Sequence, residues 1–282
     1  MRRCTDLWVS IFLLLPGSFG WAQKCSSEFS HNHSLCQFEK KARAGDRDAQ
    51  YNLGLAFDKG MGVPNDCAVA AKWYTEAANH GRSAAQNNLA VLYATGCGVP
   101  HDEAEAAKWY LRAAAGGFAA AQNNIGYAYE TGRGVKQNLE EAVHWYREAA
   151  NQKYAPALAN LASLYLSGRG VAKSESEAAQ LERLAADQGF PAAEAAVGKM
   201  YLIGWNVEKN AATAVRWFRR AAEHGDARAA NALGELVEQG VGVAKNPDEA
   251  QRWYAKAAAT GLPSAQANLD RLKKSLVAQA GQ

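Results

Sequence analysis

The residues of this sequence whose type and spacing could support chemistry are a set of asparagines. They recur at an interval of 36 residues, each just before a leucine or isoleucine, at Asn52, Asn88, Asn124 and Asn160, with a further member in register at Asn268. An asparagine amide both donates and accepts hydrogen bonds, so a row of them can pair with an extended peptide backbone in both directions. The same pattern also fits amides that tie neighbouring helices together or face water, and Ala196 and Ala232 interrupt the row.

The histidines and serines show no arrangement that is typical of an enzyme. His80 and His224 occupy the same position of the 36-residue period, four periods apart, so they cannot chelate one ion together. A place beside the negative end of a helix explains them better. The sequence has no Ser-x-x-Lys for a serine β-lactamase mechanism, and none of its Gly-x-Gly segments has the Lys-Ser/Thr that directly follows a glycine in a phosphate-binding loop. We therefore expect no enzyme activity, no catalytic residue, no cofactor and no metal site.

Pairs of short helices must position the asparagines. In the segment 84–117, apolar residues recur at helical spacing over 89–93 and again over 106–113. The intervening GCGVP at 96–100 cannot continue a helix, so it predicts a turn. Such a hairpin has an apolar face on both helices and too little mass to cover it, so it must stack on copies of itself.

Local signals mark the ends of the second helix of each hairpin. Asp102 stands where an N-cap is wanted, and Glu105 completes a predicted capping box. Gly116 and Gly117 are expected to supply left-handed conformations at the other end. In register with Asp102, N-cap residues are predicted at Asp66, Asp102, Asn138, Ser174, Asn210 and Asn246.

The hairpin is repeated six times without insertion or deletion. Its loop glycine recurs every 36 residues, at Gly60, Gly96, Gly132, Gly168, Gly204 and Gly240. Strict self-similarity at this period predicts an all-α solenoid. Unit four departs from the pattern with Leu181-Glu182 in place of Trp-Tyr, and Lys153 replaces the glycine before it. In unit five, Trp205-Asn206 replaces Arg-Gly.

The first 22 residues have the pattern of a secretory signal peptide. Arg2 and Arg3 precede an apolar run over 7–15, and small residues place the cleavage site after Ala22. The alternative, a membrane anchor, is disfavoured because the run is much shorter than the ~20 residues that span a bilayer. We expect a periplasmic or secreted chain with no stable membrane insertion after cleavage. With a formal charge of +3 and no basic cluster, we expect no nucleic-acid partner.

Four cysteines remain when Cys4 leaves with the signal peptide. An even number in an exported chain indicates disulfides, and three pairings are possible. We favour Cys25–Cys36 and Cys67–Cys97, because stacked units bring the start of one second helix beside the loop of the next unit. Free buried thiols are the alternative. None of the four has the spacing of a metal ligand.

These features divide the chain into four parts. Residues 1–22 form the signal peptide, and residues 23–47 a flexible start with an N-terminal capping helix. Residues 48–263 form six repeats, and residues 264–282 a C-terminal capping helix and tail.

The repeated pattern A-x-x-x-L-G/A-x-x-Y-x-x-G-x-G-V-x-x-[DN]-x-x-x-A-x-x-W-Y-x-x-A-A-x-x-G resembles the Sel1-like repeat family, which is related to the tetratricopeptide repeats. The resemblance implies a right-handed α-solenoid of antiparallel helix pairs whose first helices line the concave face. It also implies an adaptor or regulatory role, because most family members have one. Many members are bacterial and periplasmic, which implies the same location here. In related superhelices the asparagine position faces the groove and holds extended chains.

We therefore expect an exported protein–protein interaction scaffold or regulatory adaptor. Its groove would bind a protein or extended peptide through the asparagine row, with the fit set by Tyr51, Val91, Tyr127 and Ser163. The alternative is a cell-wall-directed protein that binds peptidoglycan or acts as a weak β-lactamase-like enzyme, as some cysteine-rich relatives have been described.

Overall fold

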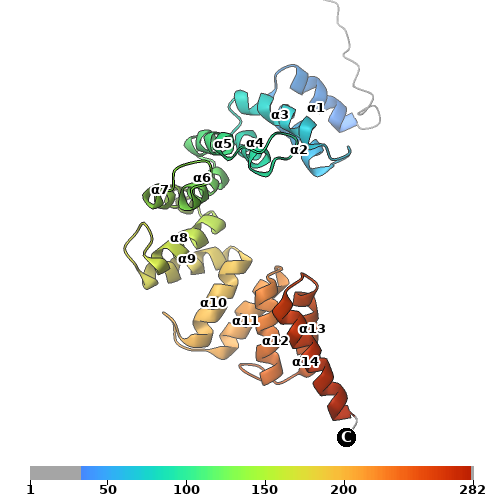
Figure 1. Cartoon of the computed structure of the whole chain (residues 1–282), viewed down its shortest axis with the longest axis vertical. Coiled ribbons are helices and arrows are strands. Elements are labelled where there is room, and N and C mark those ends of the chain that lie inside the picture. Colours follow the sequence, from blue (N-terminus) through green and yellow to red (C-terminus); the bar gives the residue numbers. More distant parts are fainter. Residues whose placement is uncertain (1–32, 281–282) are drawn as a thin grey trace, which may run out of the picture.

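The chain folds as a curved stack of antiparallel helix pairs (Figure 1). The computed structural model describes residues 33–280, and every regular element in that range is a helix. The first helices of the six pairs are α2 (Arg47–Lys59), α4 (Ser83–Thr95), α6 (Ala119–Thr131), α8 (Ala155–Ser167), α10 (Pro191–Ile203) and α12 (Ala227–Gln239). The second helices are α3 (Cys67–Asn79), α5 (Glu103–Ala115), α7 (Leu139–Asn151), α9 (Glu175–Asp187), α11 (Ala211–Glu223) and α13 (Pro247–Ala258). Each first helix starts 36 residues after the previous one, which confirms the predicted all-α solenoid.

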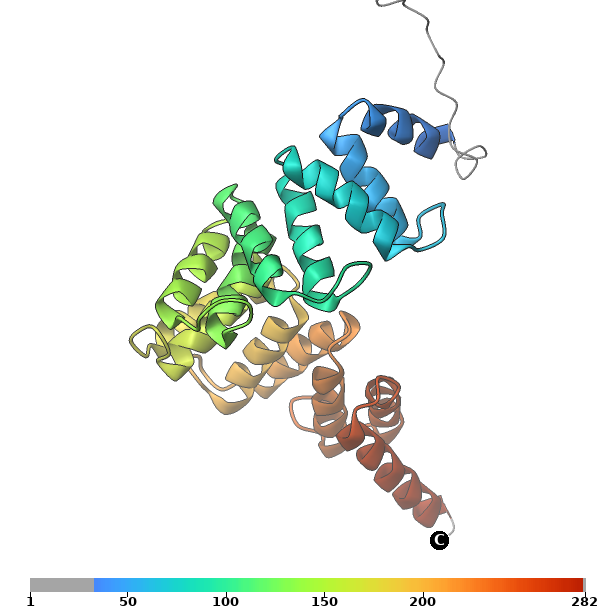
Figure 2. The ribbon, with the colours of Figure 1, turned by 45° about the horizontal axis from the view of Figure 1, so that its top comes forward.

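The pairs follow one another along an arc that encloses a hollow. In Figure 1, α4 and α6 lie nearer to this hollow than their partners α5 and α7. Helix α1 (His33–Arg43) covers one end of the array and α14 (Pro263–Ala280) covers the other, and Figure 2 shows these two ends far apart. Within residues 33–280, no helix is long and apolar enough to cross a membrane.

Side-chain caps begin the second helices. All six predicted N-cap residues accept a hydrogen bond from a backbone N–H of the first turn. The expected capping box at Asp102 is only half formed, however. The Asp102 side chain accepts from the Glu105 N–H at 2.9 Å, but the Glu105 carboxylate binds Lys108 Nζ instead. The Asp102 N–H is already satisfied by the Tyr93 carbonyl, 3.0 Å away, so it needs no second acceptor.

Glycines are required where the chain turns or where two backbones meet. A Cβ on Gly98 would lie 2.2 Å from the carbonyl carbon of Cys67, so only glycine lets this loop approach the preceding unit. The expectation of two left-handed residues after α5 was wrong. Gly117 has φ 78°, but Gly116 has φ −78°, because one left-handed residue suffices to close the helix with its C-terminal hydrogen bonds.

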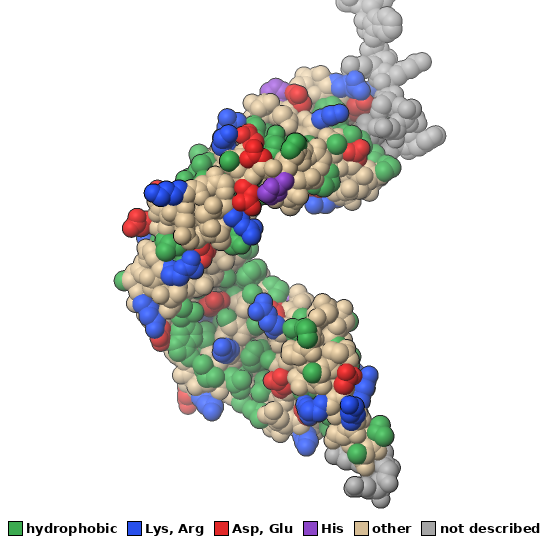
Figure 3. Space-filling view, in the orientation of Figure 1, with side chains coloured by type: hydrophobic (Ala, Val, Ile, Leu, Met, Phe, Trp, Pro, Cys, Tyr) green, Lys and Arg blue, Asp and Glu red, His purple; other side chains and the backbone are tan. Residues whose placement is uncertain are grey.

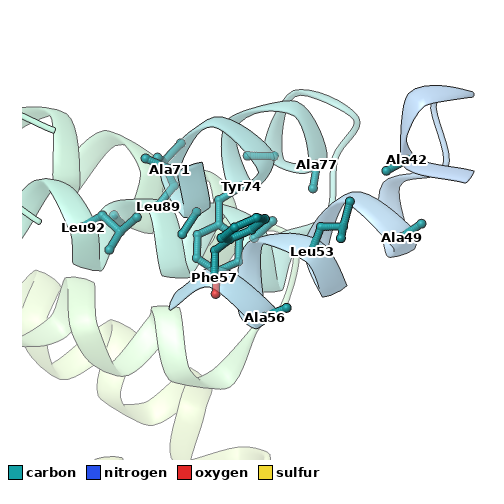
Figure 4. Close-up of a cluster of buried hydrophobic side chains, with 14 of the residues drawn as sticks. Ala42, Ala49, Leu53, Ala56, Phe57, Ala71, Tyr74, Ala77, Leu89 and Leu92 are labelled. Atoms are coloured by element: carbon teal, nitrogen blue, oxygen red, sulfur yellow. The ribbon is translucent and has the colours of Figure 1, made fainter. Parts of the chain in front are cut away.

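The core is built from alanines, branched aliphatic side chains and, in every pair except the fourth, an aromatic ring of the second helix. In the first pair, Tyr74 of α3 lies against Leu53 and Phe57 of α2, with Leu89 of the next unit beside them (Figure 4). The ring can lie flat on α2 because residue 54 is glycine: a Cβ there would sit 2.5 Å from the Tyr74 ring. Burying such a ring contributes about 2 kcal/mol to the stability of its pair. Because the pairs are stacked in a row, each unit is stabilised by contacts within itself and with its immediate neighbours.

Candidate functional site

The candidate site is the concave groove, which is visible as a hollow between the two ends of the molecule in Figure 3. The predicted row Asn52, Asn88, Asn124 and Asn160 lies on the first helices, and all four side chains are half-buried. The 36-residue period places them on the same face of consecutive helices. The structure therefore brings the predicted residues into one line.

The amides of this row are partly used inside the chain. Asn124 Nδ2 donates to Asn87 Oδ1 of the preceding unit at 3.0 Å. Asn160 Nδ2 donates in the same way to Asn123 Oδ1 at 2.9 Å. The acceptors are nearly buried, with 8% and 9% of Asn87 and Asn123 exposed. The row thus forms rungs between neighbouring first helices, which is the alternative that the sequence left open.

The two ends of the row differ from its middle. Asn88 Nδ2 donates to the Tyr74 hydroxyl at 3.1 Å, since Tyr51 rather than an asparagine stands at the facing position. Among the described residues, the Asn52 side chain has no hydrogen-bond partner. Each donating amide keeps a second N–H, so capture of a partner backbone by this row stays a prediction.

The sequence also shows why the rungs stop after unit four. Where the first residue of a rung is absent, at Ala159 and Ala195, the second is absent too, at Ala196 and Ala232. Both partners change together at these two junctions, whereas at the first junction Asn88 is kept opposite Tyr51 and donates to the Tyr74 hydroxyl. The rung returns at the last junction, where Asn268 donates to Asn231 Oδ1 at 3.1 Å. We therefore assign the amides a structural part besides any part in recognition.

Apolar side chains stand exposed beside the rungs. Val91 is 38% exposed and Tyr127 is 43% exposed, and Ser163 follows them in register. Tyr51, the remaining side chain expected to set the fit, is half-buried against Tyr74. The groove thus offers amides and apolar contacts side by side, which suits an extended chain that carries alternating side chains.

Two pockets open at equivalent positions, two units apart. The first has about 160 Å³ and is lined by residues that include Ala94, Tyr110, Asn124, Tyr127 and Arg133. The second has about 390 Å³, and each of these residues has its counterpart 72 positions later, at Leu166, Glu182, Ala196, Lys199 and Trp205. Burial raises the pKa of Tyr110 to about 12, so this phenol stays neutral, and Glu103 and Arg133 are the charged residues of the first pocket.

The pockets occur where a tyrosine–carboxylate pair is missing. In units one, three and six the tyrosine ring is fully buried on a glycine and its hydroxyl donates to an acid of the same unit, as from Tyr146 to Glu130 Oε2 at 2.8 Å, whereas unit five has Phe218 against Gly198 and no such acid. The same pair forms from Tyr74 to Asp58 and from Tyr254 to Glu238. In units two and four the glycine is replaced by Ala90 and Ala162, which have no room for a flat ring, and the acid is replaced by Ala94 and Leu166.

A buried carboxylate that the sequence reasoning missed lies on α10. Glu194 is fully buried, with His224 Nδ1 2.8 Å from Oε2 and Arg220 Nε 2.8 Å from Oε1. His80 contacts Gln50 Oε1 in the equivalent place at 3.0 Å. Each of the two histidines therefore links the C-terminal end of a second helix to a polar side chain of the first helix 30 residues earlier. The signal that could have revealed this contact is the constant separation of 30 residues between the two partners.

The remaining candidates are cysteines and metal ligands. A disulfide joins Cys67 to Cys97 with a Cα–Cα distance of 5.5 Å, the predicted link between units one and two. The predicted Cys25–Cys36 bond falls on Cys25, which lies outside the described residues, as does the predicted signal peptide. No cluster of three or more metal-ligating side chains occurs in residues 33–280.

Comparison with known proteins identifies the repeat. A family model described as the Sel1 repeat matches six consecutive segments, 47–81, 83–118, 119–154, 155–190, 191–226 and 227–262. No curated protein sequence matches the chain.

Solved structures share the same architecture. A Sel1 repeat protein from Oxalobacter formigenes is 31% identical, with a TM-score of 0.71, over 79% of this chain and 94% of that one. A protective antigen of uropathogenic Escherichia coli with an SLR fold is 36% identical, with a TM-score of 0.69, over 83% of this chain; the match spans 50% of the antigen. An immunity protein of Pseudomonas aeruginosa, 23% identical with a TM-score of 0.54 over 78% of this chain and 82% of its own, shares the fold.

Proposed function

The chain belongs to the Sel1 repeat family, whose repeats mediate protein–protein interactions, and on this premise we propose that it is an exported scaffold that binds an extended segment of a partner protein in its concave groove. The observation that carries the proposal is the composition of the groove. Half-exposed amides and exposed apolar side chains alternate along consecutive first helices, while the aromatic core residues are buried elsewhere.

Export is supported by two independent features. The sequence begins with the pattern of a signal peptide, and the Cys67–Cys97 disulfide is of the kind that persists outside the cytoplasm. N-terminal sequencing of the mature protein should find Gln23 at or near its start. Recovery of Met1 from mature material would contradict export by cleavage.

Groove binding is tested by capture of partners from an envelope extract, with purified sacculi as the second bait. A protein bound in a fixed stoichiometry supports the scaffold, whereas retention on sacculi alone favours the cell-wall alternative. Tyr127→Ala should weaken capture, because this ring is exposed in the groove. Leu184→Ala is the matched control, since Leu184 is 53% exposed on a second helix. Equal loss in both variants would contradict a groove-specific site.

A further inference from the structure

The pocket between units four and five gathers several departures from the repeat pattern. Leu166 replaces an acid, Glu182 replaces a tyrosine, Ala196 replaces an asparagine, and Trp205 replaces an arginine. These residues come from three helices and a loop, yet they line one pocket of about 390 Å³. Figure 3 shows hydrophobic side chains gathered over α10, one of the helices that form it. Changes scattered along the sequence therefore converge on one place in the fold.

Glu182 holds an acceptor that nothing in the described chain satisfies. Its Oε2 is buried and has no hydrogen-bond partner among residues 33–280. Burial raises the pKa of this carboxyl to about 7. Buried acceptors are nearly always paired in folded proteins, and an unpaired one costs stability. A ligand that donates to Glu182 would complete the site.

The other charged groups around the pocket are Lys173, Glu175 and Lys199. Glu175 is engaged: it accepts from Trp205 Nε1 at 2.9 Å and pairs with Lys173 Nζ at 3.2 Å, which together hold its pKa below the usual range. Lys199 is exposed on α10. The pKa of Glu182 is raised by burial, with no lowering contribution from Lys199. Glu182 is therefore the carboxyl of this pocket that no described group pairs with.

The walls suit a long aliphatic stem. Leu166 and Ile203 are 37% and 59% exposed at the rim, and Met200 is buried behind them. The Trp205 ring is fixed by its hydrogen bond to Glu175, so it offers a stable aromatic surface. A basic side chain combines such a stem with a cationic head, and arginine can also stack on an indole ring.

We propose that this pocket takes a lysine or arginine side chain of the partner protein, with its stem on Leu166 and Ile203 and its charged head on the Glu182 carboxylate. The inference rests on the proposed function, because it places one side chain of the segment that the groove binds. It also assigns unit four a role in specificity that the regular units do not have, since in three of them a tyrosine–carboxylate pair fills the equivalent space.

The pocket is tested with small probes, so that the result does not depend on the partner. We would titrate N-acetyl-lysine N-methylamide into the full chain and follow the Trp205 indole N–H by NMR, assigned with Trp205→Phe. The neutral probe is N-acetyl-norleucine N-methylamide. Glu182→Gln should weaken binding of the lysine probe about tenfold, as expected for a lost charge-assisted hydrogen bond. Glu130→Gln is the matched control, because Glu130 is a groove carboxylate already paired with Tyr146 and Arg169.

The pH dependence gives a second readout. Because the carboxyl must ionise to bind a cation, affinity for the lysine probe should rise by roughly tenfold between about pH 6 and about pH 8 in the wild type, and stay flat in Glu182→Gln. Affinity that falls over this range would mean that a protonated Glu182 donates to an acceptor, and it would overturn the proposal. Equal binding of both probes, or no shift at Trp205, would also overturn it. A partner whose capture depends on Tyr127 but not on Glu182 would leave the scaffold function standing without this pocket.

Discussion

Single residues decide where the repeat is regular and where it is not. Lys153 and Asn206 are the non-glycine residues with positive φ in the described chain, at 61° and 52°, and both stand where neighbouring units have glycine. Asparagine tolerates this conformation, and the Asn206 side chain donates to the Glu175 carbonyl at 3.3 Å. Lys153 is exposed and has no such compensation, so it carries backbone strain at the start of unit four.

Lys153→Gly should therefore stabilise the protein. Left-handed backbone costs about 1–2 kcal/mol for a residue with a Cβ, and the extra freedom of glycine in the unfolded state offsets about 0.5–1 kcal/mol, so we expect a gain of roughly 0.5–1 kcal/mol. The matched control is Gly117→Lys, since Gly117 has φ 78° and open space around a Cβ. It should lose a similar amount. Urea unfolding measures both, and a loss in Lys153→Gly would show that its side chain has a role of its own.

Glu182 should make the stability of the protein depend on pH. Its pKa of about 7 in the folded state lies above the ordinary value of 4.5. The favourable contribution is thus fully present below about pH 4.5 and is lost as the pH rises through about 7, by up to about 3 kcal/mol. Glu182→Gln removes this dependence. The unfolding free energy of the variant minus that of the wild type should therefore increase between about pH 5 and about pH 8. Parallel profiles for the two proteins would contradict the buried carboxyl.

At the scale of helices, what could be predicted depended on how local the signal was. The six N-caps could be predicted because an N-cap bonds to its own first turn, two or three residues away. The asparagine rungs were one of the alternatives that the sequence left open, but their partners could not be predicted, since Asn124 finds its acceptor 37 residues back, on the preceding first helix. A register argument alone does not say which of two adjacent asparagines faces the neighbour.

The same limit applies to the two buried carboxyls. Glu182 was visible as a departure from the pattern, but its burial depends on how α9 packs against the helices around it, which the sequence does not give. The ion pairs of Glu194 could not be predicted from its neighbours in the sequence, because its partners lie 26 and 30 residues later. The period located the elements, whereas the polar contacts depend on which helix faces which.

The rungs predict a difference between Asn87, the acceptor of a rung, and Asn52, a member of the row that forms none. Asn87→Ala leaves the Asn124 amide without its acceptor in a nearly buried place, so it should cost about 1–2 kcal/mol of unfolding free energy. Asn52→Ala removes an amide that has no partner in the described chain and should change stability by less than about 0.5 kcal/mol. Thermal and urea melts of the two variants measure this contrast. Equal losses would mean that the rung contributes nothing to the interface.

For the whole molecule, stacking makes the array nearly one-dimensional. Each unit contacts its neighbours, and the only covalent link between units apart from the backbone is Cys67–Cys97 within the described residues. Stability then approximates a sum over units and their interfaces. The constant 36-residue step matters because it keeps the rungs, the loop glycines and the helix faces in register at once.

Removal of one whole unit should therefore leave a folded, shorter solenoid. Deletion of residues 119–154 joins Phe118 to Ala155 and brings Asn160 to Asn87, which replaces the lost acceptor Asn123 by an equivalent one. Unfolding should stay cooperative, with a urea m-value lower by roughly one sixth, because m follows the surface exposed on unfolding. Deletion of 119–150 is the control: it removes four residues fewer and turns the following first helix away from its partner. If both deletions melt alike, registry between units is not what holds the array together, and each pair would have to be stable by itself.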